Sequence, residues 1–256
     1  MGPCGRMICT VITMLAASFG GPLAGQEYPK WFLFPDLLPC KTAVGFEEFS
    51  STAQGVGRRA TREAVEAYAR LHRSTITGTR FLWMSDGGSI PMENSVRIIA
   101  DEDFALQLKG RAVVLDTFIT KEFTALLLSD GACKIGEELK EKISLHTLSM
   151  PVWVDTNLSE DEEFLSATGV SEKIQPPHRG WVIAERNAIL ALAFSVSSTT
   201  RSLTELERQY HQKVRESIHI TLRDIRVDGR WYDVKNKTFV VRVKMKKSLS
   251  QKGESE

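Results

Sequence analysis

Two similar stretches decide how this chain is interpreted: Ala60-Thr-Arg-Glu-Ala-Val-Glu-Ala-Tyr-Ala69 and Ala184-Glu-Arg-Asn-Ala-Ile-Leu-Ala-Leu-Ala193. Their alanines at four positions and their arginine match at a constant offset of 124 residues. In both stretches alanine recurs at i, i+4 and i+7, which is the spacing of one face of an amphipathic helix. Each stretch therefore predicts a helix whose small side chains let it lie close against a sheet.

Two shorter blocks repeat in the same order. Gly45 aligns with Gly169 at the same offset, and further upstream Pro29-Lys-Trp31 aligns with Pro151-Val-Trp153 at an offset of 122 residues. Three blocks in one order indicate an internal duplication. We therefore predict an α+β fold of two tandem modules, each with helices packed on one face of a small antiparallel sheet. The predicted repeat framework comprises Trp31, Gly45, Ala60, Ala64, Trp153, Gly169, Ala184, Ala188 and Trp231.

The rest of each module follows from periodicity. Each module begins with a strand that is predicted to end at its glycine. In the second module, helical spacing over 203–214 changes to the period-two pattern of a strand from Ile218, and two more strands are predicted at 225–233 and 239–245. The first module closes in the same way, with strands at 111–118 and 123–128. Phe118 is the nearest candidate for a counterpart of Trp231.

The N-terminal segment predicts export. Arg6 is followed by an uncharged stretch over 7–19, by Gly20-Gly21-Pro22, and by small residues before Gln26. The apolar stretch has the length of a signal-peptide core and is shorter than a spanning helix. We predict a signal peptide over 1–25 that is cleaved before Gln26; an uncleaved N-terminal anchor is the alternative. No later segment is long and apolar enough to span a bilayer.

The remaining boundaries follow from the modules. We predict the first module over 26–130, a linker helix over 131–148, the second module over 149–247 and a disordered tail over 248–256. The linker helix is expected because Ile135, Leu139 and Ile143 lie four apart in a charged segment.

After the leader is removed, the only cysteines that remain are Cys40 and Cys133. Two interpretations stand: one disulfide, as oxidising compartments favour, or two buried small side chains.

In these motifs the chain resembles the lipoprotein-20-like family of bacterial envelope proteins. The fullest match is the second copy, which carries Trp153, Gly169, the alanine-rich helix, Asp228 and Trp231. The resemblance implies an exported α+β module without known catalysis, used for scaffolding or interaction. The chain departs from the family at the lipidation site, where Gln26 stands in place of the required cysteine. We therefore expect a periplasmic or envelope-associated protein that is not lipidated.

Composition and motifs argue against several classes of function. The formal net charge is +1, so the chain lacks the basic surplus of a nucleic-acid-binding protein. Gly55-Val-Gly57-Arg-Arg-Ala60 has the glycine spacing of a dinucleotide loop but lacks the acidic residue that should follow. The histidines have no zinc spacing, the acidic run 160–163 lacks the pattern of a calcium loop, and no serine or cysteine stands in a triad motif. We predict no catalytic, cofactor-binding or metal site.

Two classes of function remain. The first is a non-enzymatic envelope protein that acts as a scaffold or interaction module, with another envelope protein or assembly as its partner. The second is a periplasmic hydrolase, or a protein that binds a glycan or small ligand, with a site between the two modules. The second class requires a polar pocket with convergent titratable side chains at that junction.

Overall fold

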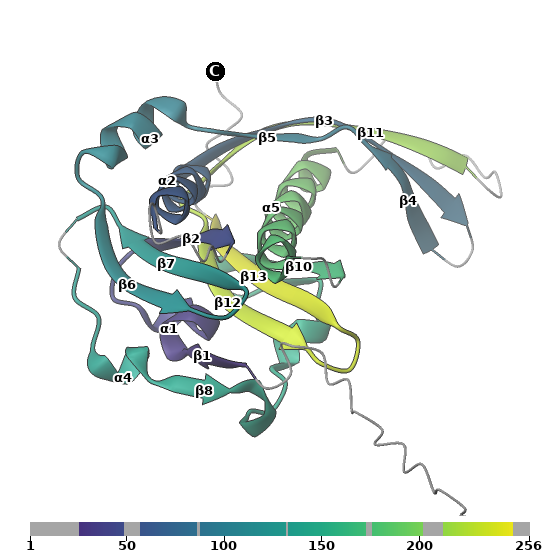
Figure 1. Cartoon of the computed structure of the whole chain (residues 1–256). Helices are drawn as coiled ribbons and strands as arrows, with labels where there is room; N and C mark the ends of the chain where they lie inside the picture. The colour runs from purple at the N-terminus through teal and green to yellow at the C-terminus, as the bar shows by residue number, and fades with distance from the viewer. Residues whose placement is uncertain are drawn as a thin grey trace, which may run out of the picture.

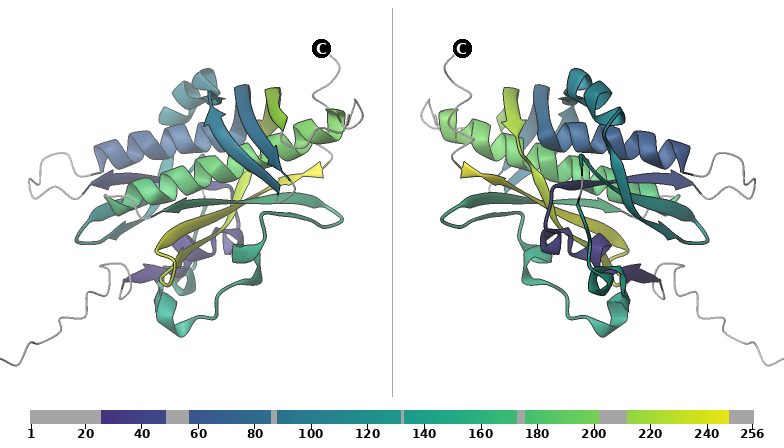
Figure 2. Two further views of the ribbon diagram at one scale, coloured as in Figure 1. Left: turned by 90° about the vertical axis from the view of Figure 1, so that its right-hand side faces the viewer. Right: turned by 90° about the vertical axis from the view of Figure 1, so that its left-hand side faces the viewer.

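Two long helices, α2 (Arg58–His72) and α5 (Pro177–Arg201), form the middle layer of the fold. In the computed structural model they lie side by side, with sheets on both of their faces (Figures 1 and 2). The structure describes residues 26–48, 57–85, 88–131, 133–172, 176–201 and 212–247. The predicted signal peptide (1–25) and tail (248–256) lie outside the described residues.

The short helices and the strands complete the chain. The short helices are α1 (Lys30–Leu33), α3 (Glu102–Lys109) and α4 (Glu137–Lys140), with 3-10 helices η1 (Pro35–Leu37), η2 (Leu145–Thr147) and η3 (Val152–Asp155). The strands are β1 (Glu27–Pro29), β2 (Thr42–Glu48), β3 (Arg73–Ser85), β4 (Gly88–Asn94), β5 (Arg97–Ala100), β6 (Val113–Ile119), β7 (Phe123–Ser129), β8 (Lys142–Ser144), β9 (Leu158–Glu160), β10 (Phe164–Glu172), β11 (Gln212–Arg223), β12 (Arg226–Asp233) and β13 (Thr238–Lys246).

The sheets below the two helices have the same strand order in both halves of the chain. One sheet runs β2-β7-β6 and the other β10-β13-β12, with β9 added at its edge, and every pair is antiparallel. The mixed composition and antiparallel sheets confirm the predicted α+β class. The edge strands share a further detail, because β6 is bulged between Val114 and Asp116 and β12 between Val227 and Gly229.

A glycine in each sheet sets the distance to its helix. Gly45 lies in β2, where an added Cβ would come within 1.9 Å of the carbonyl oxygen of Ala60. Gly169 lies in β10, where an added Cβ would come within 2.1 Å of the backbone nitrogen of Ala188. Each helix therefore packs directly on the backbone of its strand, as the small alanine face predicts.

The sheet above the helices joins the two halves. β3, which follows α2, pairs with β11, which follows α5, from Arg73↔Arg223 to Met84↔Gln212. β4 and β5 both pair with β3 on its other side. This sheet arches over both helices in Figure 1. The two halves are thus connected through backbone hydrogen bonds as well as through side chains.

Aromatic side chains below the helices also connect the halves. Phe32 of α1 is fully buried, and its ring lies edge-on to Trp181 of α5 at a centroid distance of 5.3 Å. Trp181 in turn contacts Phe239 of β13 at 4.9 Å. Burying large aromatic surfaces is strongly favourable, and here the buried rings belong to a single core that includes residues of both halves.

Three local predictions need correction. Gly45 and Gly169 lie inside their strands rather than at the ends, because each helix packs over the middle of its strand. The segment 131–148 is not one helix: among its described residues only Glu137–Lys140 is α-helical, and 142–144 form β8, which pairs with β1. Of the predicted helix over 203–214, residues 203–211 lie outside the described residues, and 212–214 belong instead to β11, which begins at Gln212 and pairs with β3.

Candidate functional site

A cleft of about 330 Å³ lies between α2 and α5, at the junction of the two halves. Its floor is β2, with Val44 and Phe46 buried and Glu48 exposed at the end of the strand. The helices form its walls. Both charged and apolar side chains line it, so the cleft can contact a ligand through ionic groups and through apolar surface.

The α2 wall is a row of charged side chains. Arg59, Glu63, Glu66 and Arg70 follow each other at intervals of three or four residues, so they share one face of the helix. Glu63 is half-buried, and burial raises the pKa of its carboxyl group while a hydrogen bond from the backbone of Phe46 opposes that shift. Within the described part of the chain, neither Arg59 nor Glu63 forms an ion pair.

The α5 wall comes from its first two turns and contributes His178, Arg179, Val182 and Ile183. His178 is only 8 % exposed, and its Nδ1 has no hydrogen-bond partner among the described residues. Burial lowers the pKa of this imidazole, Glu48 opposes the shift, and Arg179 and Arg59 add to it. Glu48, Arg59 and Arg179, which line the same cleft, thus act on the charge of this imidazole.

A buried ionic cluster adjoins the cleft through Arg70, which lines it. Glu185 of α5 lies 3.8 Å from Arg70 and 3.5 Å from Arg230, and Arg230 donates a hydrogen bond to the carbonyl oxygen of Phe32. Burial lowers the pKa of Arg230, and the carboxylate of Glu185 opposes this shift. Because a buried charge is costly without its partner, this cluster fixes the two halves relative to each other. Arg70 Nε is buried without a partner among the described residues.

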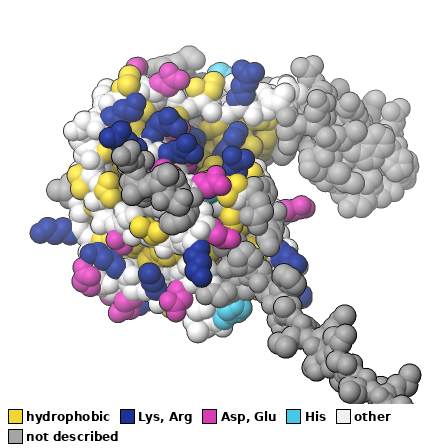
Figure 3. Space-filling view, viewed as in Figure 1, with side chains coloured by type: hydrophobic (Ala, Val, Ile, Leu, Met, Phe, Trp, Pro, Cys, Tyr) yellow, Lys and Arg dark blue, Asp and Glu magenta, His cyan; other side chains and the backbone are white. Residues whose placement is uncertain are grey.

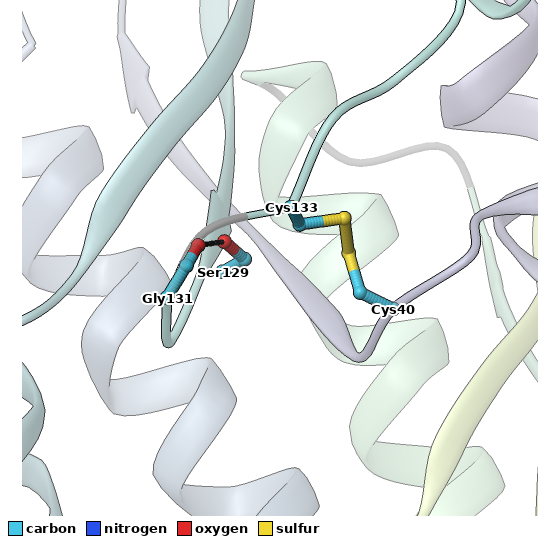
Figure 4. The surroundings of a disulfide bond; sticks show 4 residues. All are labelled: Cys40, Ser129, Gly131 and Cys133. Atoms are coloured by element: carbon cyan, nitrogen blue, oxygen red, sulfur yellow. Dashed lines mark hydrogen bonds between the residues drawn. A yellow bond between two sulfur atoms is a disulfide. The ribbon is translucent and has the colours of Figure 1, made fainter.

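Cys40 and Cys133, proposed from the sequence as a possible pair, are joined by a disulfide (Figure 4). Their Cα atoms are 6.3 Å apart and 93 residues separate them in the sequence. Cys40 precedes β2, and Cys133 follows β7, where Ser129 donates a hydrogen bond to the carbonyl oxygen of Gly131. The bond therefore ties the segment after β7 to the start of β2, outside the cleft.

The predicted framework tryptophans lie at the bulged edge strands. Trp31 donates a hydrogen bond from Nε1 to Asp116 at 2.7 Å, and Asp116 directly follows the β6 bulge. Trp153 packs against Gly229, which directly follows the β12 bulge. Trp231 is 5 % exposed in β12, and Phe118, its suggested counterpart, is 3 % exposed in β6. The alanines Ala60, Ala64, Ala184 and Ala188 are fully buried at the helix–strand contacts.

None of the residues predicted as framework lines the cleft. The histidines lack a zinc spacing, so the sequence does not point to His178, and no motif marks the charged face of α2 as part of a site. A signal was present, because Arg59, Glu63, Glu66 and Arg70 occupy the helix face next to the alanine stripe. What the sequence could not provide is the position of α5 beside that face.

The described residues hold no group of three or more His, Cys, Asp or Glu side chains arranged to bind a metal ion. Among the helices that the structure describes, none has the length and apolar character needed to cross a membrane. No protein-family model, curated protein or solved structure matches this chain.

Proposed function

We propose that this chain is a non-enzymatic envelope protein, exported and not lipidated, that presents the cleft between its two halves to another envelope component. The observation that carries the proposal is the cleft itself: both halves line it, and several of its charged side chains have no ionic partner among the described residues. Unpaired charges at a partly buried surface favour a binding partner of complementary charge. The chain would then act as an interaction module, as the lipoprotein-20-like resemblance implies.

The duplication belongs to the same proposal. Two tandem modules, over 26–130 and 149–247, are supported by the shared strand order, by the matching bulges and by the glycine–helix contacts. The register agrees as well: Gly45 pairs with Leu126 and Gly169 with Val241, and in each sheet the bulge lies opposite the next two residues of the central strand. A duplication would explain why the cleft lies between two equivalent helices.

Site-specific photo-crosslinking in cells that produce the protein tests this function. A photoreactive residue replaces Glu66, which is exposed at the cleft, or Lys235, which is exposed in the turn between β12 and β13. The Glu66 position is expected to capture one reproducible envelope partner that the Lys235 position does not capture. Equal capture from both positions, or no capture from Glu66, would contradict the proposal.

A periplasmic hydrolase is the second candidate. It is favoured by Glu63 and His178, because burial raises the pKa of the first and lowers that of the second within one cleft, an arrangement found in acid–base sites. It ranks second because no Ser, Thr or Cys stands among the described residues that line the cleft, so a hydrolase would need direct attack by water. Turnover of peptide or glycan substrates that is lost in Glu63→Gln would establish it.

A further inference from the structure

The unsatisfied groups of the cleft define what it can bind. Arg59 lies in the first turn of α2 and Arg179 in the first turn of α5; both are exposed and line the cleft, and no described residue forms an ion pair with either. The buried imidazole of His178 lines the same cleft, and its Nδ1 has no hydrogen-bond partner among the described residues. Guanidinium groups bind carboxylates through strong charge-assisted hydrogen bonds. The cleft therefore fits an anionic group.

The acidic residues of the cleft favour a ligand with a small negative charge. Glu48, Glu63 and Glu66 line the same space, and they would repel a polyanion. Glu63 lies half-buried and forms no ion pair with another described residue; beyond the hydrogen bond from the backbone of Phe46, its carboxylate can accept an N–H donor or an ammonium group of the ligand. The ligand consequently needs one carboxylate and at least one nitrogen donor.

Apolar surface and size complete the requirements. Val44 and Phe46 form the floor, and Val182 and Ile183 are partly exposed on the α5 wall. A volume of about 330 Å³ is at the lower end of ligand pockets, so the cleft accepts a short segment rather than a folded chain. Amide N–H groups, methylene groups and carboxylates occur together in acidic peptides.

We infer that the cleft binds a short acidic peptide, with one carboxylate held between Arg59 and Arg179 and an N–H or amino group directed at Glu63. The inference rests on the proposed function, because it takes the cleft as the surface that meets the partner. It adds the chemistry of the segment that this partner contributes. Binding should therefore depend on the two guanidinium groups, which come from different halves of the chain.

Calorimetric titration of the full chain with dipeptides tests the inference. The amide of Glu-Gly, which carries one carboxylate and one amino group, is expected to bind about tenfold to hundredfold more tightly than the amide of Gln-Gly, which has no carboxylate; this is the range for hydrogen bonds to charged groups. Arg59→Gln and Arg179→Gln should each weaken binding of Glu-Gly amide by about tenfold or more. Arg186→Gln is the matched control, because Arg186 is exposed on α5 and does not line the cleft. Thermal unfolding of each variant checks that its fold is retained.

Three results would overturn the inference: equal binding of Glu-Gly amide and Gln-Gly amide, retention of the affinity for Glu-Gly amide in both arginine variants, or competition by inorganic phosphate at the same affinity as Glu-Gly amide. The last result would identify a general anion site. If photo-crosslinking from the Glu66 position still captures a partner while Glu-Gly amide does not bind, only the ligand class fails and the proposed function stands. If both experiments are negative, the proposed function fails as well.

Discussion

At the residue scale, Gly45 and Gly169 hold the helices at their observed distance from the sheets. An added Cβ would meet the backbone of α2 at 1.9 Å or that of α5 at 2.1 Å, and backbone cannot move aside as a flexible side chain can. Gly45→Ala and Gly169→Ala are each expected to lower the free energy of unfolding by about 3 kcal/mol, as overpacked cores do. Urea unfolding followed by circular dichroism measures this loss.

Gly110→Ala serves as the control for these two variants. Its nearest contact to an added Cβ is 3.8 Å away, which is an ordinary packing distance, and Gly110 ends α3 in a right-handed conformation. Its free energy of unfolding should change by well under 1 kcal/mol. A loss in Gly110→Ala as large as that in Gly45→Ala would show that close packing on the helix is not the cause.

His178 should make stability depend on pH. Burial lowers its pKa below 6.5, so the folded protein resists protonation that the unfolded chain accepts. The stabilising effect is therefore complete above pH 6.5 and is lost as the pH falls toward the lowered pKa. His72 acts in the same direction because burial also lowers its pKa, whereas Glu63, whose pKa is raised, acts in the opposite direction.

His178→Asn isolates the contribution of this residue. The free energy of unfolding of the unmodified chain should fall between pH 7.5 and 5.5, and His178→Asn should flatten this slope by up to about 1.4 kcal/mol per pH unit. The exposed His146, replaced in the same way, provides the control. An unchanged slope in His178→Asn would mean that the imidazole does not titrate differently in the two states.

At the element scale, local patterns predicted the strands that close each half. The alternation over 239–245 matches β13, and the turn after Thr120 separates β6 from β7. The stretch from Arg73 to Ala100 was not assigned, although it forms β3, β4 and β5. Strand pairing across the chain explains why these strands were not predicted and why residues 212–214 were predicted as helix. β3 and β11 stabilise each other although they lie about 140 residues apart in the sequence. No local pattern specifies such a distant partner.

The disulfide joins elements that are far apart in the sequence. Cys40 and Cys133 close a loop of 93 residues that contains β2, α2 and the sheet strands up to β7. Restricting a loop of this length in the unfolded chain should contribute roughly 2–5 kcal/mol. The Cys40→Ser, Cys133→Ser double variant is expected to lose that amount, measured by urea unfolding without reductant.

Reductant provides the control for this element. Dithiothreitol should lower the stability of the unmodified chain to that of the double variant and leave the double variant unchanged. Alkylation of both Cys40 and Cys133 in the native, unreduced protein would show instead that the thiols are free in solution.

At the scale of the whole molecule, we expect the two halves to fold as one unit rather than as two independent domains. The β3–β11 pairing, the contact of Phe32 with Trp181 and the ion pair of Arg70 with Glu185 each join residues of both halves. Separating the halves would break a continuous core, take Arg70 from Glu185 and remove the hydrogen bond of the buried Arg230 to the carbonyl oxygen of Phe32, and lost partners are costly for buried charges. The cleft between α2 and α5 is consequently a fixed feature of the fold.

This connection predicts a single thermal transition. Scanning calorimetry should give one peak whose calorimetric enthalpy equals the van't Hoff enthalpy, the criterion for two-state unfolding. Gly45→Ala, in the first half, and Gly169→Ala, in the second, should both shift that same peak to lower temperature. Two independently folding halves would instead give two peaks, each shifted by only one of the substitutions. The cleft would then be lost whenever the less stable half unfolded. A peptide bound to both Arg59 and Arg179 would stabilise both halves, because it would bind only while both were folded.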